Sequence, residues 1–376
     1  MTRHYLDHAS TSPLRPAARD AMAEVLDAMA SGALGDPARI HVEGMRSREL
    51  LESARSTVAG WLGVRPRQVI FTSGATESIA MADHGAMQRG ARDGLDHAVF
   101  ATVEHSAVRQ SAERSRHTAV GVDHLGRADP TEFVAAVGDR TAVAHLQWAN
   151  HEVATRQAVE AVAAELGDRP TLLHVDAAQA GTDAPRAIAS GADLVSISGH
   201  KLGGPPGVGV LVIRSGLRIP PLIRGGDQER ARRAGLENLP AAIGLAAAIE
   251  EIAGHPDEAD AARAQTDRLI AWATGTEGVS VLGDPVDRAP HLVCLALEGV
   301  EPQPVLLGLD ARGFAVHSGS SCSSEAFEPS PVLAAMGVDA QRSLRISVGW
   351  STGDADIDAL VGALDDVLGE LRSLAR

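Results

Sequence analysis

Apolar segments of strand length alternate with amphipathic segments of helix length along this chain, and this alternation restricts its fold more than any other feature. Strands that are separated by helices pair in parallel through crossover connections. We therefore predict an α/β fold with a mainly parallel, doubly wound sheet. The main predicted strands are 69–72, 98–103, 141–148, 171–175, 194–197 and 208–213, and helices are predicted at 46–62, 159–166 and 240–253.

Length, charge and hydropathy narrow the classes of function. A chain of 376 residues can bury a large core and form two domains, which we separate at the Gly-His-Pro breaker 254–256. The net charge of −15, with no basic patch standing out, argues against direct binding of nucleic acid. No apolar run is long enough to cross a bilayer and no leader is visible, so we expect a cytoplasmic protein that does not contact membranes.

Lys201 is the only lysine in the sequence, because 34 Lys+Arg minus 1 leaves 33 arginines. Arginine cannot replace an amine that must lose its proton and attack a carbonyl. Lys201 follows the strand 194–197 in a Gly/Pro-rich turn, where open sheets place their ligands. This position favours a Schiff-base lysine that holds pyridoxal 5′-phosphate (PLP), and an incidental surface lysine is the alternative.

The turn Ser73-Gly74-Ala75-Thr76 joins the strand 69–72 to a helix that opens near Thr76. Small residues there let the first backbone N–H groups of the helix approach a phosphate, which the helix dipole also favours. The sequence therefore indicates a phosphate site, with a plain strand-to-helix turn as the alternative.

Polar residues follow three of the predicted strands, at 104–105 (Glu-His), 150–152 (Asn-His-Glu) and 176–179 (Asp-Ala-Ala-Gln). The carboxyl ends of strands line the ligand crevice in such sheets. We expect these side chains to form a pocket beside Lys201, although each of them alone is also consistent with a structural cap.

The two cysteines do not suggest a disulfide framework and are interpreted as separate thiols. Cys294 lies in an apolar strand and is interpreted as a core residue. Cys322 lies in the small polar run 318–324, where nothing in the sequence would bury it. A thiol with a pKa of about 8.5 is only partly ionised at neutral pH, yet its thiolate is strongly nucleophilic. Cys322 is therefore a candidate nucleophile, with an incidental loop cysteine as the alternative.

Nine segments, in order, carry a resemblance over nearly the whole chain: YLDHASTSP, TSGATES, VEHSAV, NHEVAT, HVDAAQ, SGHKLGGPPGVG, RGGDQERARRAG, SGSSCSSEAFEPS and LRISVG. The chain resembles the cysteine desulfurases of the NifS/IscS type, which are fold-type I PLP enzymes of the class V aminotransferase group. The resemblance implies a large PLP-binding domain, 15–255, with a mainly parallel seven-stranded sheet between helices. It also implies a smaller α+β domain, 1–14 and 256–376, with the catalytic cysteine on a mobile loop of about residues 318–331.

The resemblance also implies a role for each candidate site residue. Lys201 would hold PLP and later move the substrate Cα proton, and Asp176 would keep the pyridinium nitrogen protonated. Cys322 would attack the substrate sulfur and leave as a persulfide. The other implied roles are His105 on the ring face and in catalysis, Gln179 on the phenolic oxygen, Ala75, Thr76, Ser198 and His200 on the phosphate, and Asn150 and Arg345 on the substrate.

The implied reaction converts L-cysteine to L-alanine and passes the sulfur to an acceptor protein, an Fe–S scaffold or a thiolation enzyme. A homodimer without a metal is also implied. Two alternatives remain: another PLP enzyme such as a selenocysteine lyase, cystine C–S lyase or transaminase, or a PLP-free scaffold for sulfur transfer.

Two positions depart from the family pattern. Leu236 stands where a threonine usually reaches the neighbouring subunit's phosphate, which predicts a weaker grip on PLP or a substitute such as Ser73. Trp350 stands where a polar or basic residue is common, which predicts an altered pocket rim.

Lys201→Arg tests the central prediction, because arginine keeps the positive charge but cannot act as a neutral amine. We expect the variant to lose both the visible absorbance of bound PLP and turnover. Absorption spectra after addition of PLP, together with an assay for alanine, measure the two effects. An unchanged spectrum with unchanged turnover would refute the assignment of Lys201.

Overall fold

The computed structural model describes residues 3–318, 329–339 and 341–374. Within these residues, seven strands form the main sheet in the order β2-β8-β7-β6-β5-β3-β4. The strands β3 to β7 pair in parallel, whereas β8 is antiparallel to both of its neighbours. The predicted mainly parallel α/β sheet is confirmed. Its strands are β2 (Val69–Thr72), β3 (His97–Ala101), β4 (Arg116–Val120), β5 (Thr141–Gln147), β6 (Leu172–Asp176), β7 (Leu194–Ser198) and β8 (Gly209–Ile213).

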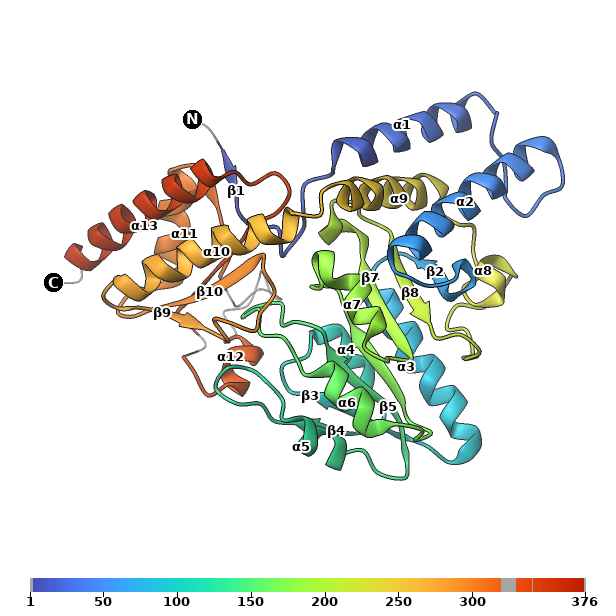
Figure 1. Ribbon diagram of the computed structural model, residues 1–376, viewed down its shortest axis with the longest axis horizontal. Helices are drawn as coiled ribbons and strands as arrows, with labels where there is room; N and C mark the ends of the chain where they lie inside the picture. Colours follow the sequence, from blue (N-terminus) through green and yellow to red (C-terminus); the bar gives the residue numbers. More distant parts are fainter. Residues whose placement is uncertain (1–2, 319–328, 340, 375–376) are drawn as a thin grey trace.

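Both faces of this sheet are buried, because successive strand residues point to opposite faces and both sets are apolar. In β3, Phe100 packs into the core on one face and Val99 into the core on the other. Helix α3 packs along β5 to β8 on the first face. The helices of this part are α1 (Pro16–Ala30), α2 (Val42–Trp61), α3 (Ala75–Gly90), α4 (Ser106–Ala112), α5 (Pro130–Ala135), α6 (Val159–Leu166), α7 (Ala184–Ala189), α8 (Gln228–Ala231) and α9 (Leu239–Gly254). Helices α1 and α2 pack on α9 at one end of the sheet (Figure 1).

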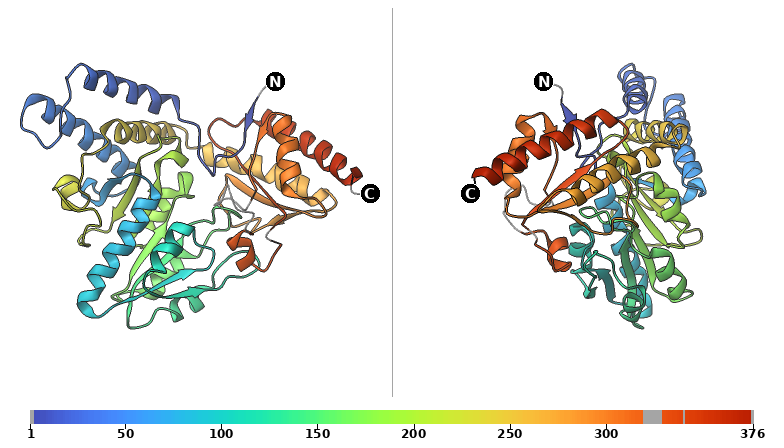
Figure 2. Two further views of the ribbon diagram at one scale, coloured as in Figure 1. Left: turned by 180° about the vertical axis from the view of Figure 1, so that it is seen from behind. Right: turned by 60° about the vertical axis from the view of Figure 1, so that its left-hand side comes forward.

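A smaller antiparallel sheet in the described C-terminal part has the order β12-β10-β9. It has its own apolar core, which includes residues of α10, α11 and α13. The N-terminal strand β1 pairs in parallel with β11 and therefore lies among these C-terminal elements (Figure 2). The elements are β1 (His4–Tyr5), α10 (Glu258–Gly275), β9 (Val279–Leu282), β10 (Leu292–Leu297), α11 (Pro302–Ala311), β11 (Phe314–Ala315), α12 (Pro331–Ala335), β12 (Ser343–Ser347) and α13 (Asp354–Leu374).

The edge strand β4 has no counterpart among the predicted strands. Four of its five residues, Arg-His-Thr-Ala, are exposed, and only Val120 is buried. A strand at the edge of a sheet can be polar on most of its length, so it lacks the apolar run that marks the central strands. Among the helices of the described residues, none has the length and apolar character needed to cross a membrane.

A buried ion pair joins α2 to α8. Arg55 Nη1 lies 2.6 Å from Glu229 Oε2, and the two side chains are 3% and 1% exposed. The same carboxylate accepts a hydrogen bond from the backbone N–H of Phe71 in β2. Glu229 has a φ of 49°, in the left-handed region that non-glycine residues rarely adopt. The ion pair therefore holds a strained turn against the end of the main sheet.

Glu229→Gln removes the negative charge that pairs with the buried Arg55 and leaves Glu52 as its remaining carboxylate partner. The substitution should therefore lower the free energy of unfolding by about 2 kcal/mol. Urea denaturation measures the change. The control is Asp20→Asn, which breaks the pair between Arg19 and Asp20, whose side chains are 68% and 63% exposed. The control should leave stability almost unchanged. Equal effects of the two substitutions would contradict this prediction.

Candidate active site

A cavity of about 510 Å³ lies beside the carboxyl ends of β5, β6 and β7. It collects most of the candidate residues from distant parts of the sequence. Asn150 does not line it, and Cys322 lies outside the described residues. The candidates that line the cavity are Ala75, Thr76, His105, Asp176, Gln179, Ser198, His200, Lys201 and Arg345.

One end of the cavity is formed by the start of α3. The first N–H groups of a helix have no intrahelical acceptor. In α3 the N-cap residue is Gly74, which has no side chain to cap them. Gly209 of β8 lies against this turn, since a Cβ on it would come within 2.6 Å of Gly74. With the hydroxyls of Thr76 and Ser198 nearby, this end has the donors that a phosphate requires.

Glu77 also lines this end, but its carboxylate forms an ion pair with Arg233. Arg233 Nε donates to Glu77 Oε1 at 2.8 Å, and the backbone N–H of Ser73 donates to Oε2 at 2.7 Å. The acidic side chain is therefore drawn toward Arg233. Leu236 is 62% exposed and is not among the lining residues, whereas Ser73 is.

Two carboxyl groups with different surroundings follow β3 and β6: Asp176 lines the cavity, whereas Glu104 lies outside its lining. Asp176 is the last residue of β6 and accepts a hydrogen bond from the backbone N–H of Ala178. Glu104 is 1% exposed, and its Oε1 accepts from the N–H of Gln147. Burial, and then the charge of Asp176, raises the pKa of Glu104 well above its usual value. This shift favours the protonated form of Glu104.

His105 caps the N-terminus of α4, and its Nδ1 accepts a hydrogen bond from the backbone N–H of Ala107. Because Nδ1 accepts, the neutral ring carries its proton on Nε2. Burial lowers the pKa of His105. Its ring meets the ring of His151 edge-on, with the centroids 5.1 Å apart. His105 is thus held as a neutral ring in the wall of the cavity.

Lys201 lies on the short 3₁₀ turn η4 (Gly199–Leu202) between β7 and β8. Gly203 ends this turn with a φ of 77°. The pKa of the neighbouring His200 is lowered by burial and then by the positive charge of Lys201. Burial is also the largest cause that lowers the pKa of His151, and the charge of Lys201 contributes there too. Lys201 is therefore surrounded by neutral histidines.

Arg345 of β12 is 3% exposed, and three segments hold its guanidinium. Nη1 donates to the carbonyl oxygen of His151 at 3.0 Å, and Nη2 donates to Asp7 Oδ1 and Ser10 Oγ at 3.0 and 2.6 Å. Its buried Nε has no partner among the described residues. A guanidinium with an unpaired donor beside the cavity suits the binding of a carboxylate.

Asn150 is fully buried and shapes the loop after β5. Its Oδ1 accepts hydrogen bonds from the N–H groups of Glu152 and Val153, and its Nδ2 donates to the carbonyl oxygen of Val103. The side chain is engaged with the backbone rather than with the cavity. Its predicted role as a substrate ligand has no support in this arrangement and stays a prediction.

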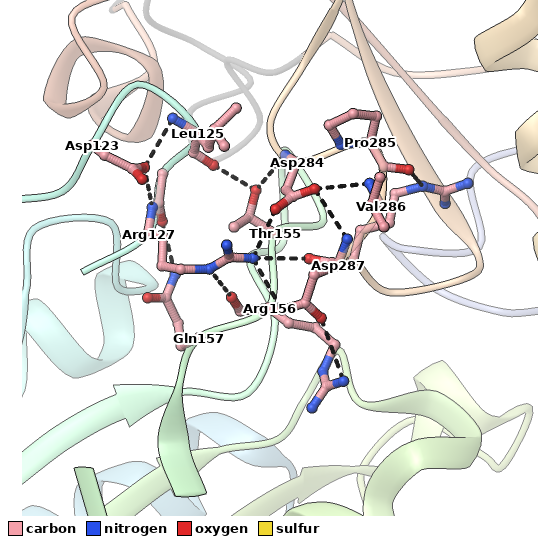
Figure 3. A network of polar contacts seen from close by, with 12 residues as sticks. Asp123, Leu125, Arg127, Thr155, Arg156, Gln157, Asp284, Pro285, Val286 and Asp287 are labelled. Carbon is pink, nitrogen blue, oxygen red and sulfur yellow. Dashed lines mark hydrogen bonds and ion pairs between the residues drawn. The ribbon is translucent and has the colours of Figure 1, made fainter. Parts of the chain in front are cut away.

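A polar clamp fixes the same loop to the segment before β10 (Figure 3). Arg127 Nη2 lies 3.0 Å from Asp284 Oδ2 and 3.1 Å from Asp287 Oδ2. Thr155 accepts from the N–H of Asp284, and Arg156 donates from its backbone N–H to the carbonyl oxygen of Asp287. The clamp secures the backbone that positions His151 and, through it, Arg345.

Several lining residues were not among the candidates: His151, Gln147 and Ser10 line the cavity as well. His151 and Ser10 lie within motifs that the sequence analysis singled out, whereas the only signal for Gln147 is a polar residue inside an apolar strand. Trp350 packs outside this cavity, where its Nε1 donates to the carbonyl oxygen of Pro13.

Cys294 is fully buried, and burial raises the pKa of its thiol to about 12. A thiol in this environment stays protonated at neutral pH, which fits its interpretation as a core residue. In the described ranges, no group of three or more His, Cys, Asp or Glu side chains is placed to hold a metal ion.

Glu152 provides a pH test of this loop. It is 2% exposed, and burial raises its pKa from 4.5 to about 7. Between pH 4.5 and about 7, Glu152 keeps its proton in the folded chain and releases it in the unfolded chain. The free energy of unfolding therefore falls as the pH rises through this range. We expect the free energy of unfolding to fall by about 3 kcal/mol across this window relative to Glu152→Gln. Urea denaturation at several pH values measures it, and a pH-independent difference would contradict it.

Comparisons with known proteins agree over the whole chain. The family model described as aminotransferase class-V matches residues 4–360. A cysteine desulfurase from Gluconacetobacter diazotrophicus is 37% identical, over 100% of this chain and 96% of that protein. The solved structure of a NifS-like protein has a TM-score of 0.90 at 28% identity and covers 98% of this chain and 100% of its own. The structure titled "SspA in complex with cysteine" has a TM-score of 0.76 at 25% identity, covering 92% and 99%. The chain belongs to the class-V aminotransferase family and, within it, to the cysteine desulfurases of the NifS/IscS type.

Proposed function

We propose that this cysteine desulfurase binds PLP at Lys201, converts L-cysteine to L-alanine, and carries the sulfur as a persulfide on Cys322. The observation that carries the proposal is the cavity itself. It brings together one amine, one carboxyl group and the start of one helix, at Lys201, Asp176 and Ala75 respectively. These groups match the aldehyde, the pyridinium nitrogen and the phosphate of PLP.

The residues of the cavity fit the cofactor in charge as well as in type. The start of α3 with Thr76 and Ser198 would hold the phosphate. Asp176 would hold the ring nitrogen, and the raised pKa of Glu104 disfavours a second negative charge beside it. His105 would cover the ring face. When bound, PLP supplies an electron sink that allows the substrate Cα to release a proton.

Arg345 would bind the substrate carboxylate through its guanidinium, which is the geometry that arginine offers. Its contacts to Asp7 and Ser10 hold the group in place before substrate arrives. The Nζ of Lys201 would take the proton from the substrate Cα. Neutral His105, with its proton on Nε2, would serve as a nearby acid at the same face.

Cys322 would supply the nucleophile, and the described residues on either side of its segment contact Arg345, which lines the cavity, and Glu152. His317 forms a β-bridge with Arg345, and the hydroxyl of Ser330 donates to Glu152, next to His151. The Sγ of Cys322 would form a bond to the substrate sulfur while the substrate C–S bond breaks. The carbon then takes up a proton to give alanine, and the persulfide passes to an acceptor.

The partners and the domain division are part of the same proposal. Exposed apolar side chains on α1, Leu26 and Met29, and on the loop at Leu222 and Ile223 support a homodimer. The separate cores of the two sheets support a large domain of residues 15–255 and a small domain of 1–14 with 256–376. The acceptor would be an Fe–S scaffold or a thiolation enzyme, and the cytoplasmic location stays a prediction.

Cys322→Ala separates this proposal from other PLP lyases. We expect the variant to keep the visible absorbance of bound PLP but to lose persulfide formation and cysteine turnover, because the sulfur has no thiolate to accept it. Alanine release and persulfide labelling measure the loss. Cys294→Ala is the matched control and should keep turnover, since that thiol is buried in the core. Full activity of Cys322→Ala would favour a lyase that needs no cysteine nucleophile.

A further inference from the structure

A second and smaller cavity, of about 60 Å³, lies behind Lys201. Lys201 and Gln179 line both cavities, and the smaller one is also lined by His8 and His291. His291 is the residue directly before β10. It follows the segment that the Arg127 clamp secures (Figure 3). A histidine from the C-terminal part of the chain is therefore held beside a predicted cofactor ligand.

The contacts of Gln179 determine how its amide is turned. Its Nε2 donates to the carbonyl oxygen of Ala9 at 2.9 Å, and its Oε1 lies 3.1 Å from His291 Nε2. A carbonyl oxygen can only accept, so the nitrogen end of the amide must face Ala9. The oxygen end faces His291, which must then carry a proton on Nε2.

The protonation state of His291 agrees with this assignment. Burial, and then the positive charge of Lys201, lowers the pKa of His291 to about 4. The ring is neutral at pH 7 and carries a single proton. The contact with Gln179 Oε1 places that proton on Nε2.

We propose that His291 is a positioning residue that turns the Gln179 amide so that an N–H group faces the phenolic oxygen of PLP. The inference rests on the proposed function. The amide nitrogen of Gln179 has two hydrogens. One is donated to the carbonyl oxygen of Ala9, and the second has no acceptor among the described residues. Without a donor at His291, the amide oxygen loses its partner, and the contact of Nε2 with Ala9 is left alone to hold this orientation.

The consequence is a change in the chromophore rather than only in turnover. A hydrogen bond donated to the phenolic oxygen stabilises its anionic form. With PLP bound, the nitrogen of Lys201 that joins it would then bind its proton less tightly, because the adjacent negative charge would be partly neutralised. Loss of the hydrogen bond from Gln179 would therefore raise the pKa of this nitrogen. We call it the pKa of the chromophore, because the visible absorbance of bound PLP reports it.

Two amide substitutions at one position make the test. In His291→Gln the side-chain nitrogen can reach the place of Nε2, whereas in His291→Asn it stops short. We expect the asparagine variant to raise the pKa of the chromophore by about one unit. The glutamine variant should restore the wild-type value. Spectra of the PLP-loaded protein, recorded from acid to alkaline pH, measure both.

Two further variants make the result specific. Gln179→Leu should cause the same shift as His291→Asn, and the double variant should shift no further, because both remove one interaction. His8→Asn changes another histidine of the small cavity, which contacts Ser12, and should leave the titration unchanged. Thermal melting shows whether each variant is folded. If His291→Asn does not fold, His291→Phe replaces it, with the same expected shift.

A wild-type titration curve in the folded His291 variant, or an equal shift in His8→Asn, would overturn the role of His291. The binding of PLP to Lys201 would stand in either case. A wild-type protein that takes up no PLP would overturn both this inference and the proposed function.

Discussion

The parallel register of β5, β6 and β7 is the constraint on which the site depends. Gln147 of β5 lies opposite Asp176 of β6, and Asp176 lies opposite Ser196 of β7. The strands β5 and β6 therefore end at one level, β7 runs two residues further to Ser198, and the segments that leave these ends meet at the cavity. Because side chains alternate between faces, a slip of one residue would turn Asp176 away from the cavity. The hydrogen-bonded sheet thus fixes the strand ends from which the site residues project or follow.

Burial then decides which groups of the cavity carry charge. Burial lowers the pKa of the histidines His105 and His151 because it disfavours their cationic form, and it raises the pKa of Glu104 for the corresponding reason. The cavity is also lined by the basic side chains of Lys201 and Arg345. In a chain with a net charge of −15, the cavity is therefore a local exception that favours anionic groups such as a phosphate and a carboxylate.

The C-terminal part of the chain completes what the main sheet begins. Arg345 comes from β12, and it is held by Asp7 and Ser10 from the first residues of the chain. The loop after β5 is bound on one side to Arg345 and on the other to the segment around Asp284. These contacts join segments that are more than 100 residues apart into one wall, so the substrate end and the cofactor end of the cavity are mechanically connected.

By itself, the sequence determined the parts that depend on local pattern. The alternating strands β2 and β5 to β8 were predicted to within two residues, because a strand buried on both faces needs a continuous apolar run. The single lysine and the polar residues after strands pointed to one edge of the sheet. The tertiary structure alone decided which of those polar residues face the cavity. Asn150 bonds to two N–H groups of its own loop and to the carbonyl oxygen of Val103, and His151 lies at the cavity wall instead. Only contacts across the fold could reveal Gln147 and His291 beside the site, since hydrogen-bond partners and burial are properties of the packed chain and leave no periodic signal in its sequence.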